Sequence, residues 1–307
     1  MTDIKILQEK ILKLKAEKNA VLLVHNYQRP EIQDIADYIG DSLGLSIKAQ
    51  STEAKTIVFC GVDFMAQTAS ILNPNKLVLL PNLRAGCPMA AMIDVEGLLM
   101  MKNEYPNSVV VSYINTTAEV KAASDYCCTS ANALKVCSVI PEKEIIFTPD
   151  TNLGLYIQQK LPDKLFHFWP GYCPTHQRYI LAEDVKRLKI KYPDAMVIAH
   201  PECTMDVLEL ADKVTSTEGM VNFVRETNHH IKRFIICTER ELIYRLKKEF
   251  PDREFLLPSN VVCPTMKQIT LEDIYNSLLH LRYEIRVPEN IRLKALVPIK
   301  KMIEIGR

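Results

Sequence analysis

The sequence lacks the features that would place the protein in a membrane or on a nucleic acid. No apolar run approaches the roughly 18 residues that a membrane-spanning helix needs. Residues 1–20 are charged throughout and contain neither the apolar region nor the cleavage site of a signal peptide. Lys and Arg are scattered and the net charge is +1, so no bulk attraction to nucleic acid or to a membrane surface is expected. We therefore expect a cytoplasmic protein.

Cysteine pairs with the Cys-x-x-Cys spacing are also absent, although the chain has nine cysteines, and the one close pair, Cys127-Cys128, is vicinal and a poor metal clamp. Zinc fingers and ferredoxins take their ligands from clustered cysteines such as Cys-x-x-Cys, and no such cluster occurs in this sequence. Disulfides are rare in the cytoplasm because thiols are kept reduced there. Cysteines that matter for function should therefore be metal ligands or nucleophiles that come from distant parts of the chain.

The chain does have a regular alternation of short apolar runs with helical patterns, which is typical of α/β folds with parallel strands. Three of the apolar runs end in a similar polar triplet. They read VLLVHNY, VVVSYIN and MVIAHPE, and they occupy residues 21–27, 109–115 and 196–202. His25, Tyr113 and His200 take the same place in these runs and lie 88 and 87 residues apart. The chain is therefore a threefold repeat of one unit of about 87 residues.

Two further markers repeat in the same register. Ser42, Ser130 and Thr217 also lie 88 and 87 residues apart, and each precedes a helical pattern, where Ser and Thr are good N-caps. Each repeat closes on a Cys-Pro pair, with its cysteine at Cys87, Cys173 or Cys263. One Cys-Pro pair is most simply a turn after a strand. Three in register indicate a shared role.

We predict an α/β fold of three homologous αβα sandwich domains with small parallel sheets, in a pseudo-threefold arrangement around a central active site. Each repeat reads as a βαβαβ unit. The expected division is an N-terminal helix, three repeats, and a C-terminal strand and helix that pack back on the core, over residues 1–20, 21–105, 106–190, 191–280 and 281–307. Ligands bind at the carboxyl ends of the strands in open α/β sheets, so these ends should build one cavity.

Three thiolates that meet at one point suit a metal centre. Zinc normally takes four protein ligands in a structural site, whereas a [4Fe–4S] cluster held by three cysteines leaves one iron open as a Lewis acid. The His, Tyr and Glu residues of the triplets supply proton donors and acceptors, and helix N-termini hold anions. This combination favours elimination or dehydration of a small carboxylated or phosphorylated molecule.

Several stretches of the chain resemble the quinolinate synthase family of NAD biosynthesis. They run from residue 25 to residue 270 and read HNYQ, GDSLGLS, AGCPMA, YINTTAEVKA, CTSANA, PGYC, AHPEC, STEG and CPTMKQIT. The resemblance implies one [4Fe–4S] cluster per chain, held by Cys87, Cys173 and Cys263. It also implies a transferase or lyase that condenses iminoaspartate with dihydroxyacetone phosphate to give quinolinate, phosphate and two waters.

The same resemblance implies the other residues of the site. Those expected to contact the substrates are His25, Ser42, Tyr113, Ile114, Asn115, Ser130, His176, His200, Pro201, Glu202, Ser216 and Thr217. We expect Glu202, His200, Tyr27 and Tyr113 to be catalytic, with Glu202 as the base that shuttles a proton. An oxidase or dehydrogenase that acts on aspartate would be the functional partner that supplies iminoaspartate.

Two other classes of function remain open at the level of the sequence. One is an enzyme without a metal that uses Cys87, Cys173 or Cys263 as a nucleophile beside His176. The other is an iron–sulfur or zinc sensor that binds a regulator or nucleic acid. The neutral charge and the lack of a basic helix weigh against the sensor.

Overall fold

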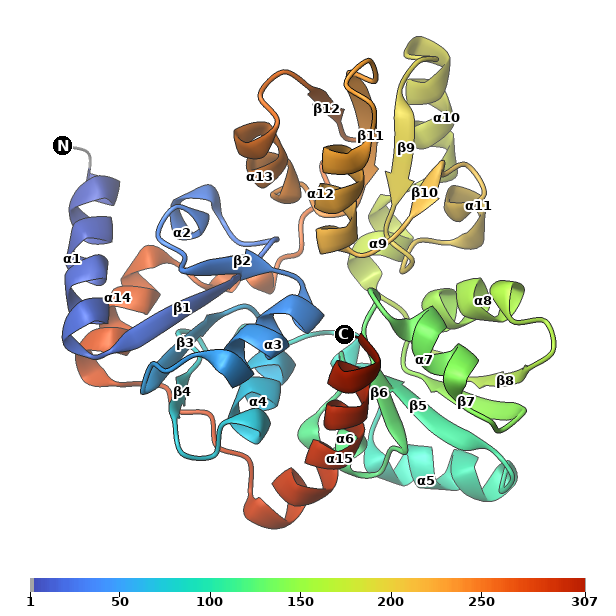
Figure 1. The fold of residues 1–307 in the computed structure, drawn as a ribbon, viewed down its shortest axis with the longest axis horizontal. Helices are drawn as coiled ribbons and strands as arrows, with labels where there is room; N and C mark the ends of the chain where they lie inside the picture. Colours follow the sequence, from blue (N-terminus) through green and yellow to red (C-terminus); the bar gives the residue numbers. More distant parts are fainter. Residues whose placement is uncertain (1–2, 307) are drawn as a thin grey trace.

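The computed structural model describes residues 3–306, and this part of the chain forms three lobes, each built on a small four-stranded sheet. Every strand pair within the sheets is parallel, and the strand order is the same in each lobe (Figure 1). The prediction of an α/β fold with three αβα sandwich units is therefore confirmed. The described residues do not include Met1 and Thr2, in the predicted segment 1–20, or Arg307, in the predicted segment 281–307.

The first lobe has the strand order β2-β1-β3-β4. Its strands are β1 (Ala20–His25), β2 (Tyr38–Gly40), β3 (Thr56–Cys60) and β4 (Leu77–Leu79). The helices within it are α2 (Pro30–Gln33), α3 (Ser42–Ser51) and α4 (Asp63–Leu72), followed by the 3₁₀ helix η1 (Ala90–Met92).

The second lobe has the equivalent order β6-β5-β7-β8. Its strands are β5 (Val109–Tyr113), β6 (Tyr126–Cys128), β7 (Glu144–Thr148) and β8 (Leu165–Phe168). Its helices are α5 (Val95–Glu104), α6 (Ala118–Ala122), α7 (Ala133–Val139), α8 (Thr151–Lys160) and α9 (Pro174–Tyr179).

The third lobe has the order β10-β9-β11-β12. Its strands are β9 (Met196–Ala199), β10 (Lys213–Val214), β11 (Arg233–Cys237) and β12 (Glu254–Leu256). Its helices are α10 (Ala182–Lys191), α11 (Met205–Leu208), α12 (Thr217–Glu226) and α13 (Leu242–Glu249), and the 3₁₀ helix η2 (Met266–Gln268) follows.

Each sheet has one strand more than the βαβαβ pattern predicts. The additional strands β2, β6 and β10 are two or three residues long and lie at a sheet edge. Such short edge strands carry too few residues for an alternating or continuous apolar pattern to stand out. The central strands are easy to find because both of their faces are covered, and β3 and β5 are buried along their whole length.

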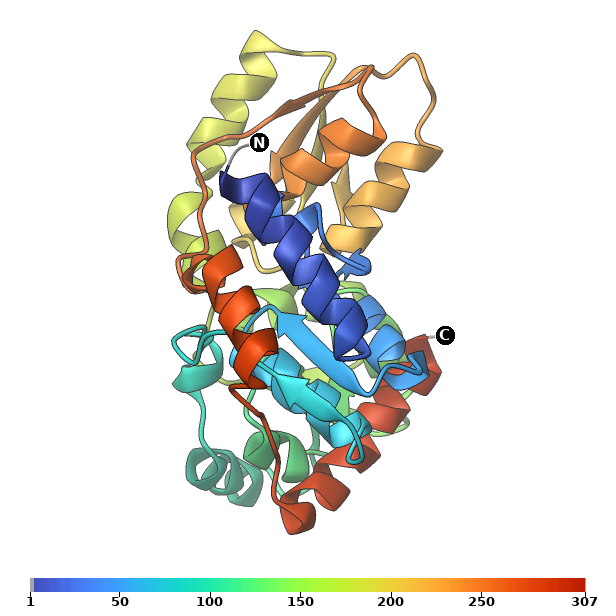
Figure 2. The same cartoon turned by 90° about the vertical axis from the view of Figure 1, so that its left-hand side faces the viewer.

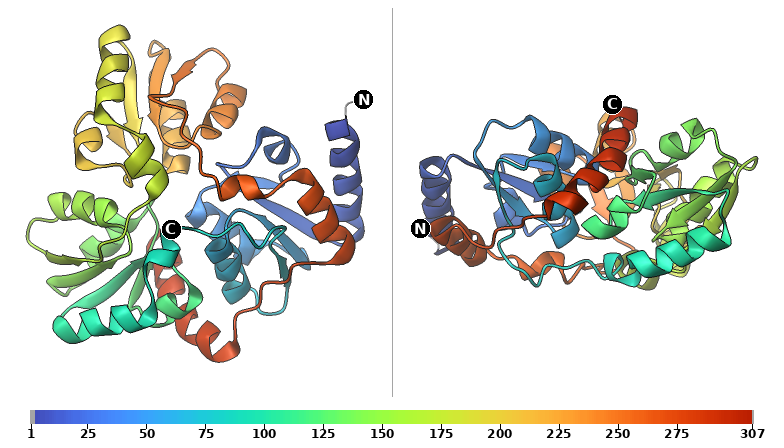
Figure 3. Two further views of the ribbon diagram at one scale, coloured as in Figure 1. Left: turned by 180° about the vertical axis from the view of Figure 1, so that it is seen from behind. Right: turned by 90° about the horizontal axis from the view of Figure 1, so that it is seen from below.

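Three further helices flank the lobes: α1 (Asp3–Glu17), α14 (Leu271–His280) and α15 (Glu289–Gly306). The helices α1 and α14 lie side by side on the first lobe (Figure 2). Figure 3 shows the segment before α14 leaving the third lobe and crossing to the first. Between α14 and α15 the chain makes an isolated antiparallel bridge from Glu284 to Leu79. None of the helices described is long and apolar enough to span a bilayer.

The apolar cores show how the lobes are joined. One large core runs through the first and second lobes and includes Ala295, Ile299 and Met302 of α15, which packs against α6, β6 and α4. The third lobe has separate cores on the two faces of its sheet. Helix α5 packs on the second lobe and α10 on the third, so each of these helices lies with the strand that follows it.

Candidate functional site

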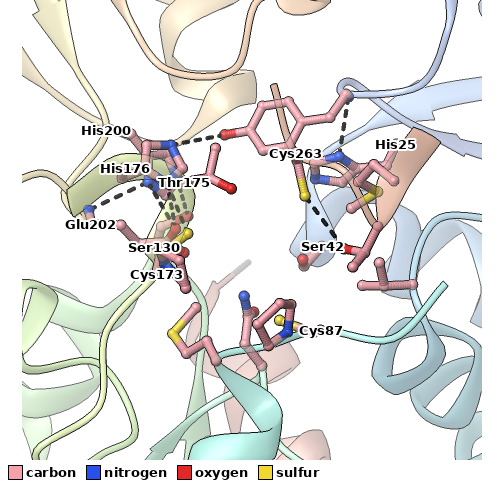
Figure 4. Close-up of a pocket in the computed structure, with 18 of the residues that line it drawn as sticks. His25, Ser42, Cys87, Ser130, Cys173, Thr175, His176, His200, Glu202 and Cys263 are labelled. Carbon is pink, nitrogen blue, oxygen red and sulfur yellow. Dashed lines mark hydrogen bonds and ion pairs between the residues drawn. The ribbon is translucent and has the colours of Figure 1, made fainter. Parts of the chain in front are cut away.

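A cavity lies at the centre of the molecule, where the carboxyl ends of strands from all three lobes meet. It contains about 900 Å³ of atom-free space, its mouth included, which is the size of a small-molecule site. Figure 4 shows side chains from separate elements pointing into it. The cavity brings together most of the residues that the sequence predicts for the site: His25, Tyr27, Ser42, Cys87, Tyr113, Asn115, Ser130, Cys173, His176, His200, Glu202, Thr217 and Cys263.

Burial separates the nine cysteines into two groups. All nine lie within residues 3–306 and none is in a disulfide, yet six are fully buried. Only Cys87, Cys173 and Cys263 are partly exposed, and all three line the cavity (Figure 4). Cys173 is the N-cap residue of α9, while Cys87 and Cys263 lie in the loops that lead to η1 and η2. The cysteines of the three repeats therefore meet at one site.

The surroundings of these thiols favour a bound cation. Burial raises the pKa of the Cys87 thiol above its ordinary value, and the nearby Cys263 and Glu202 raise it further. Burial and the charge of Glu202 likewise raise the pKa of Cys173. Thiolates crowded together in a desolvated cavity are unstable unless a positive centre compensates their charge. The donor set of three thiols therefore fits a metal centre.

Glu202 is the centre of a buried polar network. Its carboxylate accepts a hydrogen bond from the hydroxyl of Tyr113 at 2.6 Å and lies 2.7 Å from Nδ1 of His176. Burial alone would raise the pKa of this carboxyl group. The adjacent His200 and His176, with the hydrogen bonds from His176 and Tyr113, nevertheless hold that pKa well below its ordinary value. The neighbours of Glu202 therefore hold it as a carboxylate.

A second chain of contacts leads from His176 to the first lobe. Nε2 of His176 lies 2.9 Å from the hydroxyl of Thr238, which lies 2.5 Å from the hydroxyl of Tyr27. Thr238 is fully buried at the end of β11. The sequence does not mark Thr238 as a site residue, because a threonine after an apolar strand looks like an ordinary strand end. Its hydroxyl joins two predicted site residues from different lobes.

Burial favours the neutral form of His25 and His200, the other two histidines of the cavity. Burial lowers the pKa of both His25 and His200 to about 3, although Glu202 acts in the opposite direction. Nδ1 of His25 accepts a hydrogen bond from the backbone N–H of Tyr27 at 3.1 Å. Nε2 of His200 lies 3.2 Å from the hydroxyl of Ser130, and the ring stacks on His176 with centroids 4.6 Å apart. Neutral imidazoles can donate to or accept from a substrate oxygen.

The prediction that Ser42, Ser130 and Thr217 are N-caps is wrong in detail. Ser42 and Thr217 are the first residues of α3 and α12, and the N-caps are Asp41 and Ser216. Ser130 lies two residues before Asn132, the N-cap of α7. The caps lie one residue earlier because Asp41 and Ser216 accept from the backbone N–H groups of Gly44 and Gly219. The hydroxyls of Ser42, Ser130 and Thr217 are thereby left on the cavity wall.

Three residues predicted to contact substrate do not line the cavity: Ile114, Pro201 and Ser216. The hydroxyl of Ser216 is already engaged, because it caps α12 and donates to Asp41 at 2.8 Å. Ile114 packs in the apolar core and its N–H bonds to the carbonyl of Cys128. Pro201 is buried in the turn between His200 and Glu202. Adjacency in sequence to a site residue is a poor guide here, because neighbours at a strand end point in different directions.

One atom on the cavity wall has no partner. The Oδ1 atom of Asn115 is buried and makes no hydrogen bond within the described part of the chain. A buried acceptor of this kind is costly unless a ligand or water satisfies it. Asn115 is therefore placed to receive a hydrogen bond from a bound molecule.

A closer set of ligand atoms lies on one side of the cavity. Cys173, His176 and Glu202 have donor atoms within 4.8 Å of one another, which is compatible with metal binding. Cys173 and His176 are close because they lie one turn apart at the start of α9. His176 already contacts Glu202 at 2.7 Å, so its proximity to Cys173 does not by itself make it a metal ligand.

The comparisons with known proteins show the family of the chain. The sequence profile of the family described as "Quinolinate synthetase A protein" matches residues 9–304. Among curated relatives, the "Quinolinate synthase" of Geobacter metallireducens is 53% identical over 98% of both chains. The protein of the same name from Thermodesulfovibrio yellowstonii is 52% identical over 96% of this chain and 97% of the relative, and that of Clostridium perfringens is 48% identical over 98% and 99%. This chain belongs to the quinolinate synthase family.

Proposed function

We propose that this protein is a quinolinate synthase that condenses iminoaspartate with dihydroxyacetone phosphate to give quinolinate, phosphate and two waters in NAD biosynthesis. The names of its relatives support the enzyme class. The observation that carries the proposal is the central cavity, in which three cysteines from three repeats meet the Glu202 network. The cavity has the size for small substrates.

The proposed cofactor is one [4Fe–4S] cluster on Cys87, Cys173 and Cys263. Soft thiolate donors suit iron–sulfur clusters, and these three alone among the nine cysteines are exposed to the cavity. Such a cluster, when bound, supplies a Lewis acid at the iron that has no cysteine ligand.

The hydroxyls of Ser42, Ser130 and Thr217 are the proposed anchors for the anionic groups of the substrates. The substrates bring two carboxylates and one phosphate. Ser42 and Thr217 begin helices of ten residues, so the N–H groups and dipoles of α3 and α12 assist them. Asn115, whose Oδ1 is unpaired, is the proposed acceptor for a substrate N–H or hydroxyl group.

The proton transfers are assigned to the residues around Glu202. The enamine carbon of iminoaspartate attacks the phosphate-bearing carbon of dihydroxyacetone phosphate, forming a carbon–carbon bond as phosphate leaves. Glu202 then removes a proton from one carbon and returns it to the next during keto–aldo isomerisation, while His200 or Tyr27 polarises the substrate oxygen. The amine closes onto the aldehyde with loss of the first water, and loss of the hydroxyl group as the second water gives the aromatic ring.

The raised pKa values of Cys87 and Cys173 argue against the rival reading of a metal-free cysteine nucleophile. A nucleophilic cysteine needs a lowered thiol pKa, and burial acts here in the opposite direction. An oxidase or dehydrogenase that acts on aspartate is the proposed functional partner, because iminoaspartate is the two-electron oxidation product of aspartate.

Anaerobic purification tests both the cofactor and the reaction. We expect about four irons and four sulfides per chain, and quinolinate formation when the two substrates are supplied. Cys87→Ser, Cys173→Ser and Cys263→Ser should each lose the cluster, whereas Cys137→Ser, in the core, should keep it. A wild-type protein that holds zinc, or a Cys87→Ser protein with full iron content, would contradict the cofactor. A protein with an intact cluster that forms no quinolinate would contradict the reaction.

A further inference from the structure

The loops that carry the three cluster cysteines each lie against a carboxylate, and two of these carboxylates, Asp150 and Glu239, are fully buried. We propose that Asp150 and Glu239 are positioning residues that hold Cys173 and Cys263 in place, and that Asp63 does the same for Cys87. This inference rests on the proposed cluster site, and it assigns a role to three acidic residues that take no part in the proposed proton transfers. They follow the third strand along the chain in each lobe, β3, β7 or β11.

Asp150 shows the arrangement most clearly. Its side chain is fully buried and caps α8, with Oδ1 accepting from the backbone N–H of Leu153 at 2.7 Å. The other oxygen, Oδ2, accepts from the backbone N–H of Cys173 at 3.1 Å. The loop also passes close to this strand end, because a Cβ atom at Gly171 would collide with the carbonyl oxygen of Pro149. One carboxylate therefore ties the start of a helix to the cysteine.

Glu239 repeats this arrangement in the third lobe. It is fully buried, and its Oε2 atom accepts from the backbone N–H of Glu241 at 2.8 Å. Oε1 lies 3.4 Å from the backbone N–H of Cys263 and 2.9 Å from the ammonium group of Lys267. Asp150 and Glu239 hold equivalent positions in their lobes. Each lies two residues after a strand residue, Thr148 of β7 or Cys237 of β11, and these two strand residues pair at corresponding places in their sheets.

The first lobe reaches the same result from a neighbouring position. Val62 stands where strand pairing would place the acidic residue, and the carboxylate comes from the next residue, Asp63. Asp63 is half-buried, and its Oδ1 atom accepts from the backbone N–H of Phe64 at 2.7 Å. Its carboxylate also faces the cysteine loop, because Oδ2 lies 4.0 Å from the position of a Cβ atom at Gly86 and the backbone N–H of Cys87 lowers the pKa of Asp63. In the first lobe a carboxylate therefore lies against the cysteine loop from a position shifted by one residue.

These carboxylates restrict the direction in which the cysteine thiols point. A hydrogen bond to the backbone N–H of a cysteine restrains the backbone from which its Cβ and Sγ project. Three such restraints, one in each lobe, preorganise three ligands that lie far apart in the sequence. Loss of an interaction that orients a metal ligand typically costs tenfold to a hundredfold in metal affinity, by order of magnitude.

Isosteric amide substitutions test this inference without changing side-chain size. Asp150→Asn and Glu239→Gln keep one acceptor oxygen but turn an NH₂ group toward one of the two N–H donors. Asp94→Asn is the matched control, because Asp94 caps α5 through the N–H of Gly97 at 2.8 Å and none of its described contacts is a cysteine. The measurement is the rate at which each anaerobically purified protein loses iron to a chelator. We expect about tenfold faster loss from the two test variants and an unchanged rate from the control.

A second readout distinguishes positioning from general destabilisation. In the cluster-free proteins, alkylation by iodoacetamide is followed for each cysteine by peptide mass spectrometry. Asp150→Asn should accelerate labelling of Cys173 alone, and Glu239→Gln that of Cys263 alone. Since each variant is matched to one cysteine, failure of one variant to fold leaves the other as a complete test.

The outcomes separate this inference from the proposed function. Iron loss and labelling equal to the control in both variants would overturn the positioning role, and so would uniform acceleration at all three cysteines. A wild-type protein that binds no iron under anaerobic conditions would refute the proposed cluster and, with it, this inference. If the wild-type protein keeps its iron and makes quinolinate while both variants behave like the control, the proposed function stands and the positioning role is refuted.

Discussion

At the scale of single residues, the site depends on charges placed where water is excluded. Glu202 is the clearest case: it is almost fully buried, yet histidines and a tyrosine hydroxyl keep it ionised. Tyr113 lies in β5 and His176 lies in α9, so the Glu202 carboxylate contacts side chains from two separate segments of the chain. This ionised carboxylate, shielded from water, is the group that we propose as the base of the keto–aldo isomerisation.

Replacement of Glu202 by Gln should therefore lower kcat by about a hundredfold or more, because general-base catalysis typically contributes 10²–10⁴-fold, by order of magnitude. The iron content of the variant should equal that of the wild type, because Glu202 is not a proposed cluster ligand. The measurement is quinolinate formation under anaerobic conditions, normalised to iron. Glu209→Gln, exposed at the end of α11, is the control. Near-normal turnover of Glu202→Gln with an intact cluster would remove Glu202 from the role of base.

At the scale of elements, strand ends and helix starts decide where each side chain points. In each lobe the first strand ends at or just before a cavity residue: His25 is the last residue of β1, Tyr113 is the last residue of β5, and His200 follows β9. The helix caps fix the next residues, since capping by Asp41 and Ser216 leaves Ser42 and Thr217 facing the cavity. The same capping chemistry stabilises elements away from the site.

Helix α14 allows a direct measurement of such a cap. Thr270 forms a capping box with Asp273, in which each side chain bonds to the other's backbone N–H. Thr270→Ala should destabilise the protein by about 1 kcal/mol. The measurement is the shift of the denaturant unfolding midpoint of the cluster-free protein. Thr204→Ala is the matched control, because Thr204 is the N-cap of α11 but its side chain makes no cap hydrogen bond. Equal shifts for both variants would contradict the expected effect of the cap.

At the scale of the whole molecule, the three lobes are joined in different ways. The first and second lobes share an apolar core with α15, whereas the third lobe keeps its own cores. Its contacts with the first lobe include buried polar groups. Asn26, which is fully buried, donates to the hydroxyl of Thr217 at 2.9 Å and accepts from Arg245 at 2.9 Å. Arg245 also bonds to both oxygens of Glu218, so one guanidinium supports the wall of the cavity.

Arg245→Lys should show how much this junction contributes. A lysine keeps the charge but cannot reproduce the fork that contacts Asn26 and Glu218 together, so we expect a loss of about 1–2 kcal/mol and a raised KM for the substrates. Denaturant unfolding and steady-state kinetics are the measurements. Arg225→Lys is the control, because Arg225 pairs with Glu249 at a half-exposed surface and should change stability by no more than about 0.5 kcal/mol. Indistinguishable variants would mean that the junction does not depend on this arginine.

Much of the fold was predictable because the signals that carry it are local and repeated. Continuous apolar runs mark strands covered on both faces, and three copies of the same run fix the number of lobes. The short edge strands β2, β6 and β10 were not predicted, because they have too few residues to show an apolar pattern. They are strands only because they pair with the neighbouring strand. The helix starts were predicted one residue late at α3 and α12, since the choice of cap depends on which side chain reaches the N–H groups of the first turn.

The sequence by itself determined the threefold repeat, the family and the register in which Cys87, Cys173 and Cys263 recur, because periodicity and motif spacing are properties of the chain. Only the tertiary structure decided which cysteines face the cavity, that Ile114, Pro201 and Ser216 do not line it, and that Thr238, Asp150 and Glu239 contact residues of the site. The physical reason is that burial, hydrogen-bond partners and shifted pKa values arise between residues that lie up to about two hundred positions apart in the sequence, as Tyr27 and Thr238 do. A sequence pattern records where such residues recur, and only the packed molecule sets which of them touch.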